Sequence, residues 1–329
     1  MKIRMPEVYY EVKKFLKHKN EMDALYQAQL VNNKGKQVQY WNWWDDKRNA
    51  YWLQQFMESR GILKNTDKTI ALCSVFEERE VLERVKADVR IFFSGENLHN
   101  PHFAEYADYM LSEKHPFDLG IGFDEFENNR YIRFPLWLIY MFGPDATEED
   151  ICNRCEQLRY PETGPREKFA CLIARADTLG IRTDMYNAIS CITSVDCPSG
   201  LFHNDESLVN EYKDDKVAYM RQYLFNICPE NSNAWGYTTE KIFEAIAAGC
   251  IPVYLGSYNQ PEPKILNPDA IIFWNKKNGG KQTIELIKEL NTHPKQKEAF
   301  LRQPRLLPEA EDYVIAKFAE LDKRIRELV

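Results

Sequence analysis

The sequence of 329 residues has few long apolar runs. Its first twenty residues, MKIRMPEVYYEVKKFLKHKN, contain no apolar core of the signal-peptide type. The longest apolar run, FPLWLIYMF at 134–142, has nine residues, whereas a membrane-spanning helix needs about 20. We therefore expect a cytoplasmic protein, with peripheral contact at the inner membrane as the alternative.

The chain also lacks an excess of positive charge. Its net charge is −7, and the lysines and arginines are scattered along the sequence. A nucleic-acid-binding surface must neutralise many phosphates, so we expect no nucleic-acid partner. A basic pocket for one or two phosphates is compatible with this charge.

Several sequence motifs for cofactors and metals are missing as well. Neither G-x-G-x-x-G nor G-x-x-x-x-G-K-[ST] occurs, so dinucleotide-binding and P-loop interpretations lack their signatures. Cys152 and Cys155 form one C-x-x-C, but no second metal-ligand pair follows at zinc spacing. We expect the eight cysteines to be mostly buried free thiols. The stretch YKDDK at 212–216 is interpreted as a solvated charged segment, so no metal site is expected.

What the chain does contain is a repeated alternation of apolar strands with helices. This pattern is typical of a parallel sheet covered on both faces. The first series has strands at 37–41, 68–76 and 88–95 and helices at 48–61 and 78–87. The second has strands at 168–175, 223–228, 250–255 and 270–275 and helices at 182–192, 240–248 and 281–290. We expect an α/β protein of two doubly wound domains, 1–160 and 161–305, followed by a C-terminal helix, 306–329.

The two ends of the chain have helical patterns of their own. Residues 7–30 are helical in periodicity, with basic residues interleaved. In the last helix, at 311–329, an apolar seam at 4, 3, 4, 3 spacing consists of Val314, Phe318, Leu321, Ile325 and Leu328. We expect this seam to pack onto the body of the protein, with self-association or a membrane surface as alternatives.

The connector PENSNAWGYTTEK at 229–241 is too rich in polar and aromatic residues for a plain turn. It joins a predicted strand to the start of a predicted helix, where Thr238 or Thr239 is available as the N-cap. Free N–H groups at that helix start attract an anion, and Lys241 adds a positive charge, so a diphosphate fits. Glu230 and Asn231 suit sugar hydroxyls, and Trp235 and Tyr237 suit a ring. Taken singly, each residue also has an ordinary structural explanation.

The longer segment FNICPENSNAWGYTTEKIFEAIAAGCIPVYLGS at 225–257 resembles the donor-site motif of the α1,3/α1,4-fucosyltransferases, glycosyltransferase family 10. Four further segments resemble members of that family in the same order along the chain. They are NWW at 42–44, FFSGEN at 92–97, FDLGIGFDEFENNRYIRFP at 117–135 and KFACLIARADTLGIRTDMYNAI at 168–189. The resemblance covers roughly residues 37–275.

The resemblance implies a fold of the GT-B type, with two Rossmann-like domains facing across a cleft and the donor in the second. It implies transfer of L-fucose from GDP-β-L-fucose to the 3- or 4-hydroxyl of GlcNAc or glucose in a glycan, with inversion, giving Lewis-type products. No obligatory cofactor is expected, and stimulation by a divalent cation is left open. Two alternatives remain: a GT-B transferase for another nucleotide sugar, and a non-catalytic nucleotide- or glycan-binding protein.

The resemblance also implies roles for individual residues. Glu96 matches the family's general base, although Leu98 stands where relatives often have a second glutamate. Arg182 and Lys241 would bind the diphosphate, and Glu240 would stabilise the reacting sugar. The remaining donor-pocket residues would be Glu230, Asn231, Tyr237 and Thr239.

The acceptor side rests on residues at the ends of two first-domain strands. We expect acceptor contacts from Asn42, Trp43, Trp44, Asp45 and Asn97. Tryptophan faces and short polar side chains are suited to binding a sugar, although a tryptophan pair is also ordinary core.

Overall fold

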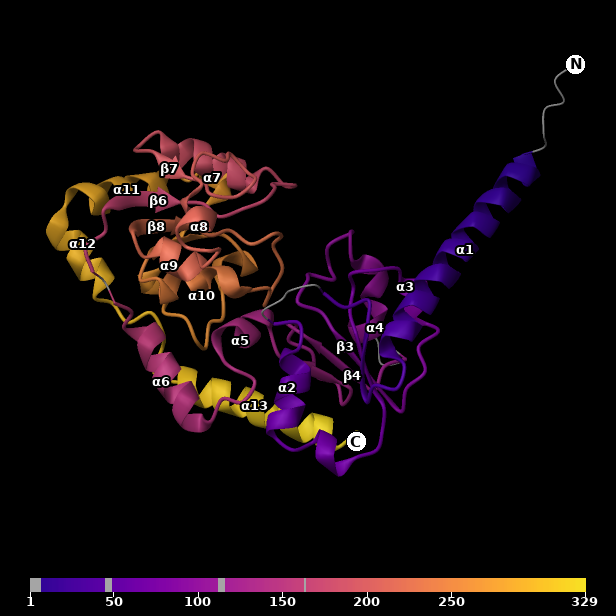
Figure 1. Ribbon diagram of the computed structural model, residues 1–329. Coiled ribbons are helices and arrows are strands. Elements are labelled where there is room, and N and C mark those ends of the chain that lie inside the picture. Colours follow the sequence, from indigo (N-terminus) through magenta and orange to yellow (C-terminus); the bar gives the residue numbers. More distant parts are fainter. Residues whose placement is uncertain (1–6, 45–48, 112–115, 163) are drawn as a thin grey trace, which may run out of the picture. The chain divides into compact units, whose positions relative to one another are not determined.

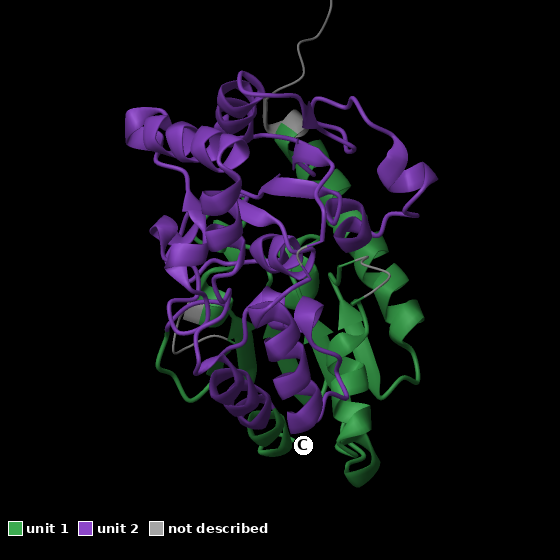
Figure 2. Ribbon diagram, turned by 90° about the vertical axis from the view of Figure 1, so that its left-hand side faces the viewer, with its two compact units in different colours: residues 1–122, 126–132, 322–329 green, residues 123–125, 133–321 purple. Residues whose placement is uncertain are grey.

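The structure is a computed structural model that describes residues 7–44, 49–111, 116–162 and 164–329. The chain forms two compact units (Figure 2). Unit 1 comprises residues 1–122, 126–132 and 322–329, and unit 2 comprises residues 123–125 and 133–321. Each unit has its own five-stranded sheet, so the α/β prediction with two Rossmann-like domains is confirmed.

The sheet of unit 1 has the strand order β1-β2-β3-β4-β5. Its strands are β1 (Val38–Trp41), β2 (Ile70–Cys73), β3 (Val89–Phe93), β4 (Leu119–Gly122) and β5 (Tyr131–Arg133). The first four run parallel, in registers such as Trp41 with Cys73 and Cys73 with Phe92. Parallel strands end at one edge of the sheet, so the residues that follow β1 and β3 share that edge.

The helices of unit 1 are α1 (Glu7–Asn33), α2 (Trp52–Ser59), α3 (Arg79–Leu82) and α4 (Asp108–Leu111). Figure 1 shows the first turns of α1 extending away from the sheet of its own unit. Its last turns lie on β1, where the Asn33 amide donates to the Tyr40 carbonyl at 2.7 Å and accepts from the Tyr40 N–H at 2.8 Å. The helix predicted at 78–87 is shorter: α3 ends at Leu82, and the N–H groups of Arg84 and Val85 bond to carbonyls three residues back instead of four.

The sheet of unit 2 has the strand order β10-β9-β8-β6-β7, and all its pairs are parallel. Its strands are β6 (Lys168–Cys171), β7 (Val195–Asp196), β8 (Tyr223–Ile227), β9 (Ile251–Tyr254) and β10 (Ile272–Phe273). The chain starts at β6, adds β7 on one side and then continues with β8 on the other. The switch point of this doubly wound sheet therefore lies between β6 and β8, where open α/β sheets bind ligands.

Helices cover both faces of the unit 2 sheet (Figure 1). Ala170 packs in the cluster with Met185 of α7 and Ile287 of α11, whereas the next residue of β6, Cys171, packs with Tyr219 and Met220 of α9. The helices are α5 (Leu136–Met141), α6 (Glu148–Arg159), α7 (Ile181–Ser190), α8 (Ser207–Asn210), α9 (Lys216–Met220), α10 (Glu240–Ala247), α11 (Lys281–Thr292), α12 (Pro294–Leu301) and α13 (Ala310–Arg326).

The compact units do not coincide with the segments expected from the sequence. Both α5 and α6 belong to unit 2, although the sequence grouped them with the first domain. The reason is packing against α10: the Trp137 ring of α5 stacks on Phe243 with centroids 4.2 Å apart. The cysteines follow expectation, since six of the eight free thiols are buried, while Cys152 of α6 and Cys191 are exposed.

The apolar seam of the last helix packs onto the body, as predicted. Val314, Phe318, Leu321 and Ile325 of α13 are all buried. The Phe318 ring lies against Phe134, with centroids 5.5 Å apart. Among the described residues, no helix is both long and apolar enough to cross a bilayer.

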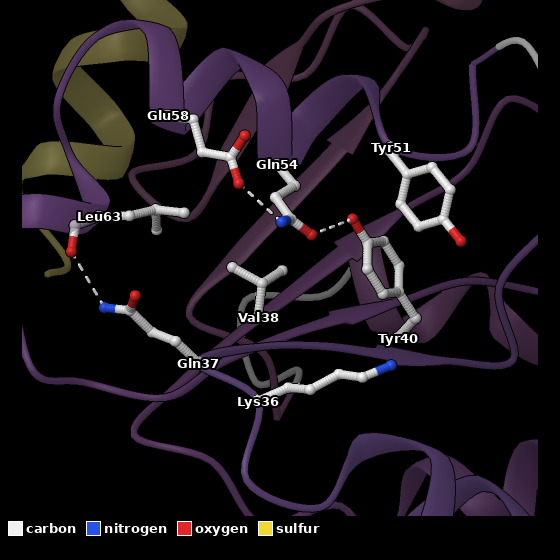
Figure 3. Close-up of a pocket in the computed structure, with 8 residues that line it drawn as sticks. All are labelled: Lys36, Gln37, Val38, Tyr40, Tyr51, Gln54, Glu58 and Leu63. Carbon is white, nitrogen blue, oxygen red and sulfur yellow. Dashed lines mark hydrogen bonds between the residues drawn. The ribbon is translucent and has the colours of Figure 1, made fainter.

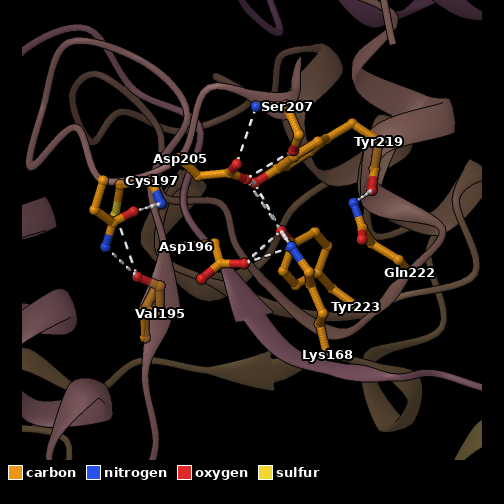
Figure 4. A network of polar contacts seen from close by, with 10 residues as sticks. Lys168, Val195, Asp196, Cys197, Asp205, Ser207, Tyr219, Gln222 and Tyr223 are labelled. Atoms are coloured by element: carbon orange, nitrogen blue, oxygen red, sulfur yellow. Dashed lines mark hydrogen bonds and ion pairs between the residues drawn. The ribbon is translucent and has the colours of Figure 1, made fainter. Parts of the chain in front are cut away.

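A network of polar side chains joins three strands of unit 2 to α9 (Figure 4). The Tyr223 hydroxyl donates to Asp196 Oδ2 at 2.8 Å, and Lys168 Nζ lies 2.9 Å from the same oxygen. The Tyr219 hydroxyl of α9 donates to Asp205 Oδ2 at 2.6 Å. Burial and hydrogen bonding to these carboxylates raise the pKa of both tyrosines, so the phenols remain donors. The network fixes α9 against the sheet.

Arg133, at the end of β5, forms a buried ion pair within unit 2. Its Nη2 lies 2.7 Å from Glu262 Oε1 and its Nη1 lies 3.2 Å from Oε2, while Nη1 also contacts the Tyr313 hydroxyl at 2.5 Å. The two charged side chains are only 6% and 3% exposed. Arg133 Nε also lies 3.2 Å from Oε1 of the exposed Glu125. Because Glu262 is buried, its charge depends on compensation by Arg133.

We expect Arg133→Met to lower the free energy of unfolding by about 3–5 kcal/mol, because it leaves Glu262 buried without its cation. Urea denaturation measures the change. The exposed pair Arg302–Glu298 provides the matched control, and Arg302→Met should change the free energy by less than about 0.5 kcal/mol. Equal effects of the two substitutions would contradict this account.

Candidate functional site

Unit 2 contains a narrow pocket at the switch point of its sheet. It lies where β6 and β8 end, between residues 172–173 and 226–229 of the two strand ends, and it reaches α7, α9 and α10. Its lining residues are Leu172, Ile173, Arg182, Lys216, Met220, Asn226, Ile227, Cys228, Pro229, Glu240, Lys241 and Glu244. Three cations and two carboxylates thus meet in one pocket.

Lys241 is held in this pocket by a buried cluster at the start of α10. Its Nζ lies 2.9 Å from Thr239 Oγ1, 3.5 Å from Glu230 Oε2 and 3.4 Å from Glu240 Oε1. The Glu230 side chain is completely buried. It accepts from the Thr239 N–H at 2.7 Å and from the Thr239 hydroxyl at 2.6 Å. Burial raises the pKa of Glu230, while Lys241 and Thr239 oppose the increase.

The start of α10 differs in one respect from the arrangement expected from the sequence. Thr239 is the N-cap of α10, as predicted, but its hydroxyl makes no cap bond. The Glu230 carboxylate binds the Thr239 N–H and so lies at the positive end of the helix dipole. Glu230 therefore acts here by positioning Thr239 and Lys241, and its own oxygens do not line the pocket.

Glu240 carries a negative charge beside these cations. Burial favours its neutral form, but the charges of Lys241 and Lys216 outweigh burial, and the pKa of Glu240 is lowered. An ionised carboxylate at this place attracts positive charge that develops on a bound molecule.

Arg182 and Asn231, two residues expected in the donor pocket, contact each other. Arg182 Nη2 donates to Asn231 Oδ1 at 2.6 Å, and Nη1 donates to the carbonyl of Ala176. Both partners orient the guanidinium at the pocket. The third cation, Lys216, comes from the stretch that the sequence analysis interpreted as solvated. Lys216 is partly exposed, but α9 begins at this residue and its side chain lines the pocket. No local pattern signals this position.

The predicted ring contact Tyr237 lies inside unit 2 instead of on the pocket wall. It is buried, with its ring 5.0 Å from that of Phe123. Its neighbour Gly236 has φ +73°, and a Cβ there would lie 2.9 Å from the Phe123 carbonyl oxygen, so the position requires glycine. Trp235 remains exposed and packs against exposed Tyr258, with centroids 4.8 Å apart.

Three hydrogen bonds from backbone N–H groups join the segment 229–241 to the loop after β9, the first from Glu230 to the Leu255 carbonyl at 2.8 Å. The Gly236 N–H donates to Ser257 Oγ at 3.1 Å, and the Tyr258 N–H donates to Asn233 Oδ1 at 2.7 Å. A Cβ at Gly256 would lie 2.5 Å from Glu230 Cγ, so glycine lets this loop approach the buried carboxylate. Gly236 and Gly256 are therefore both required by close packing, since a Cβ at either position would clash with neighbouring atoms.

In unit 1, the predicted residues lie where β1 and β3 end. Glu96 follows β3 in a turn closed by Ser94, whose hydroxyl donates to the Glu96 carbonyl at 3.0 Å and accepts from its N–H at 3.1 Å. Trp43 and Trp44 follow β1, and their ring centroids are 5.9 Å and 5.7 Å from that of Phe93 in β3. The fold thus brings both tryptophans to the strand end that carries Glu96.

The other predicted acceptor residues differ in their surroundings. Asn42 is buried with φ +48°, and its amide donates to the Glu78 carbonyl at 2.8 Å and accepts from Gln29 Nε2 at 3.0 Å. It therefore fixes the turn after β1. Asn97 is also buried, and its Oδ1 accepts from the His99 N–H at 3.0 Å. Asp45 lies outside the described residues.

No group of three or more His, Cys, Asp or Glu side chains among the described residues has an arrangement that would hold a metal ion.

The candidate residues form two sets, one in each unit. The set in unit 2 is Arg182, Lys216, Asn231, Glu240 and Lys241, supported by Glu230 and Thr239. The set in unit 1 is Glu96, Trp43 and Trp44.

Two parallel α/β units, the second with a cation-lined pocket at its switch point, define the class of the fold as GT-B. Solved structures share this fold. A crystal structure of an α1,3-fucosyltransferase with GDP-fucose superposes with a TM-score of 0.53 at 22% identity, covering 86% of this chain and 89% of the other. A second α1,3-fucosyltransferase structure gives a TM-score of 0.56 at 22% identity, with coverages of 87% and 89%.

The family itself follows from two sequence models. Residues 38–140 match the α-(1,3)-fucosyltransferase FucT N-terminal domain, and residues 163–303 match the C-terminal domain of glycosyltransferase family 10 (fucosyltransferase). The chain belongs to glycosyltransferase family 10, as the resemblance predicted.

Curated relatives match over part of their length. The α-(1,3)-fucosyltransferase FucT of Helicobacter pylori is 29% identical over 230 residues, covering 62% of this chain and 44% of the relative. The α-(1,3)-fucosyltransferase B of Drosophila melanogaster is 26% identical over 180 residues, covering 51% and 39%. The chain thus spans less than half the length of either relative.

If the pocket holds a diphosphate, as expected from the sequence, Lys216→Ala should weaken GDP binding about tenfold, because one charge-assisted contact would be lost. Isothermal titration calorimetry with GDP measures the affinity. Lys213→Ala removes an exposed lysine of the same stretch, so it serves as the control and should leave GDP affinity within about twofold. Unchanged affinity in Lys216→Ala would remove this lysine from the site.

We expect Glu230→Gln to reduce GDP affinity about tenfold and the free energy of unfolding by about 1–3 kcal/mol. The substituted amide would place a donor against Lys241 or Thr239, both of which donate to this carboxylate. Calorimetry and urea denaturation measure the two effects, and the exposed substitution Glu211→Gln is the control. Full GDP affinity in Glu230→Gln would show that Lys241 needs no such support.

Proposed function

We propose that this protein is an inverting fucosyltransferase. It moves L-fucose from GDP-β-L-fucose to the 3- or 4-hydroxyl of GlcNAc or glucose in a glycan acceptor and gives Lewis-type products. The observation that carries the proposal is the pocket of unit 2, where Arg182, Lys216 and Lys241 line the switch point together with the ionised Glu240. Membership of glycosyltransferase family 10 (fucosyltransferase) supports a nucleotide-activated fucose as the ligand of this pocket.

The cations suit the leaving diphosphate of GDP. When the bond from fucose to phosphate breaks, negative charge grows on the departing GDP, and lysine and arginine side chains stabilise that charge. Lys241 is already oriented by Thr239 and Glu230, so it reaches the phosphate without a large loss of side-chain entropy. We propose that this leaving-group assistance makes an obligatory cofactor unnecessary.

Glu240 suits the other side of the same bond. The fucose ring gains positive charge as the leaving group departs, and an ionised carboxylate stabilises an oxocarbenium-like centre. The lowered pKa of Glu240 keeps its charge at neutral pH. Asn231 is exposed and accepts a hydrogen bond from Arg182, and it would also form a hydrogen bond with a hydroxyl of the donor. The buried Tyr237 would stabilise the segment 229–241 without contacting the donor.

Inversion by a single displacement also needs a base that removes the proton of the acceptor hydroxyl. We assign this role to Glu96, which is partly exposed at the end of β3. Trp43 and Trp44 lie at the same strand ends and present aromatic surface for an acceptor sugar. Further acceptor contacts from Asn42, Asp45 and Asn97 remain predictions.

We expect the parent protein to transfer fucose from GDP-fucose to N-acetyllactosamine, and Glu96→Gln to reduce kcat at least about a hundredfold, since general-base catalysis contributes about 10²–10⁴-fold. Mass spectrometry of the product gives the rate, and NMR of the product gives the linkage. GDP affinity should be unchanged in the variant, because the base contributes nothing to phosphate binding.

Three controls accompany this measurement. Glu105→Gln, which changes an exposed carboxylate in the same unit, should keep the parental rate. GDP-mannose and UDP-galactose are offered as competing donors, and transfer from one of them in place of GDP-fucose would favour another nucleotide-sugar transferase. A parental rate in Glu96→Gln would refute the base assignment.

A further inference from the structure

Unit 1 contains a second pocket, which none of the proposed donor or acceptor residues lines. It is an open cavity of about 420 Å³ between β1 and α2 (Figure 3). Cavities that bind small molecules usually have about 300–1,000 Å³. Its lining residues are Lys36, Gln37, Val38, Tyr40, Tyr51, Gln54, Glu58 and Leu63.

Two aromatic rings form one side of this pocket. The rings of Tyr40 and Tyr51 meet edge to face, with centroids 5.4 Å apart and an interplanar angle of 87°. Tyr51 is 58% exposed, so a large part of its ring is available to a ligand. Figure 3 shows Tyr51, Tyr40 and Gln54 around one end of the pocket, with Leu63 and Gln37 at the other. Exposed aromatic rings of this kind offer apolar surface to the C–H face of a sugar.

A chain of hydrogen bonds crosses the pocket and holds its polar groups in place. The Tyr40 hydroxyl donates to Gln54 Oε1 at 2.8 Å, and Gln54 Nε2 donates to Glu58 Oε1 at 2.7 Å. The carboxylate has further lone pairs, and the amide has a second N–H. Burial and the nearby Tyr51 and Glu58 raise the pKa of Tyr40, so it stays a neutral phenol.

The charges of the lining give no net preference for an anionic ligand. Lys36 and Glu58 contribute one charge of each sign, whereas the pocket of unit 2 has three cations. Two glutamine amides, two tyrosine phenols and one carboxylate in the lining can form hydrogen bonds with neutral hydroxyl groups. Together with the ring of Tyr51, this composition is suited to a neutral saccharide.

The pocket continues an aromatic row that starts at the predicted acceptor site. The Trp43 ring lies 5.4 Å from that of Tyr40, which in turn touches Tyr51. The Trp43 Nε1–H donates to the Ala50 carbonyl at 2.7 Å, so the next residue, Tyr51, is tied to this tryptophan. A ligand in the pocket is therefore separated from Trp43 by one ring.

We propose that the pocket between β1 and α2 is a subsite for neutral saccharide units of an extended glycan acceptor, remote from the unit that receives the transferred sugar. The proposal rests on the proposed function, because Trp43 is taken as part of the acceptor site. It makes the protein selective for acceptor chains of several sugars over a single disaccharide.

The test compares N-acetyllactosamine with the oligomer of three such repeats. For the parent protein, KM for the oligomer should be about tenfold lower than for the disaccharide, the effect of one added aromatic contact with its hydrogen bonds. Tyr51→Ala and Gln54→Ala should remove this difference and leave KM for the disaccharide and kcat within about twofold. Tyr51→Phe keeps the ring and should retain most of the preference.

Tyr160→Ala is the matched control, because Tyr160 is 57% exposed and lies in unit 2. It should behave as the parent. Equal KM values for the two acceptors in the parent protein, or an unchanged preference in Tyr51→Ala, would overturn the proposal.

Direct binding separates this proposal from the proposed function. Calorimetry with the same oligomer, without a donor, should show binding by the parent and at least fivefold weaker binding by Tyr51→Ala. This result supports the subsite even if no fucose is transferred. Absence of binding, or equal binding by both proteins, refutes the subsite even if transfer occurs.

Discussion

The buried carboxylate of Glu230 is the constraint on which the proposed donor site depends. It is completely buried, and three donors from Thr239 and Lys241 surround it together with the Tyr254 hydroxyl, 3.3 Å from Oε1. An ionised group in such a place is costly unless every lone pair is used, so the positions of Thr239 and Lys241 are tightly specified. This carboxylate lies among the end of β8, the start of α10 and the loop after β9. The loop can approach it because Gly256 has no side chain.

The proposed chemistry is divided between two units with similar architecture. In both units, parallel strands bring their carboxyl ends to one edge, and the residues that follow them carry the proposed roles. Unit 2 contributes cations and an ionised carboxylate. Unit 1 contributes a glutamate and two tryptophans. It also contributes a pocket without net charge, which the Tyr40 ring separates from Trp43. The charges thus differ in the way that a phosphate-containing donor and a neutral acceptor require.

Much of the fold could be predicted from local patterns. The periodicity of apolar residues located each strand and helix that the sequence analysis named, although α3 and β10 are much shorter than expected. The spacing of the seam in α13 predicted its burial. Other elements were not named, among them β4, β5, α5 and the 12-residue α6, in which only Ile151, Cys155 and Leu158 are buried. The grouping of α6 with unit 2 also escaped, since packing on α10 is a contact between distant segments.

For the candidate site, the sequence by itself determined which chemical groups are present and their order along the chain. It identified Arg182, Asn231, Glu240 and Lys241, which the fold brings together around or beside one pocket. Only the tertiary structure decided which of the named groups are accessible. It buried Glu230 and Tyr237, brought Lys216 into the pocket and opened a cavity beside Tyr51. The physical reason is that burial and charge pairing depend on neighbours far away in the chain, which no local pattern contains.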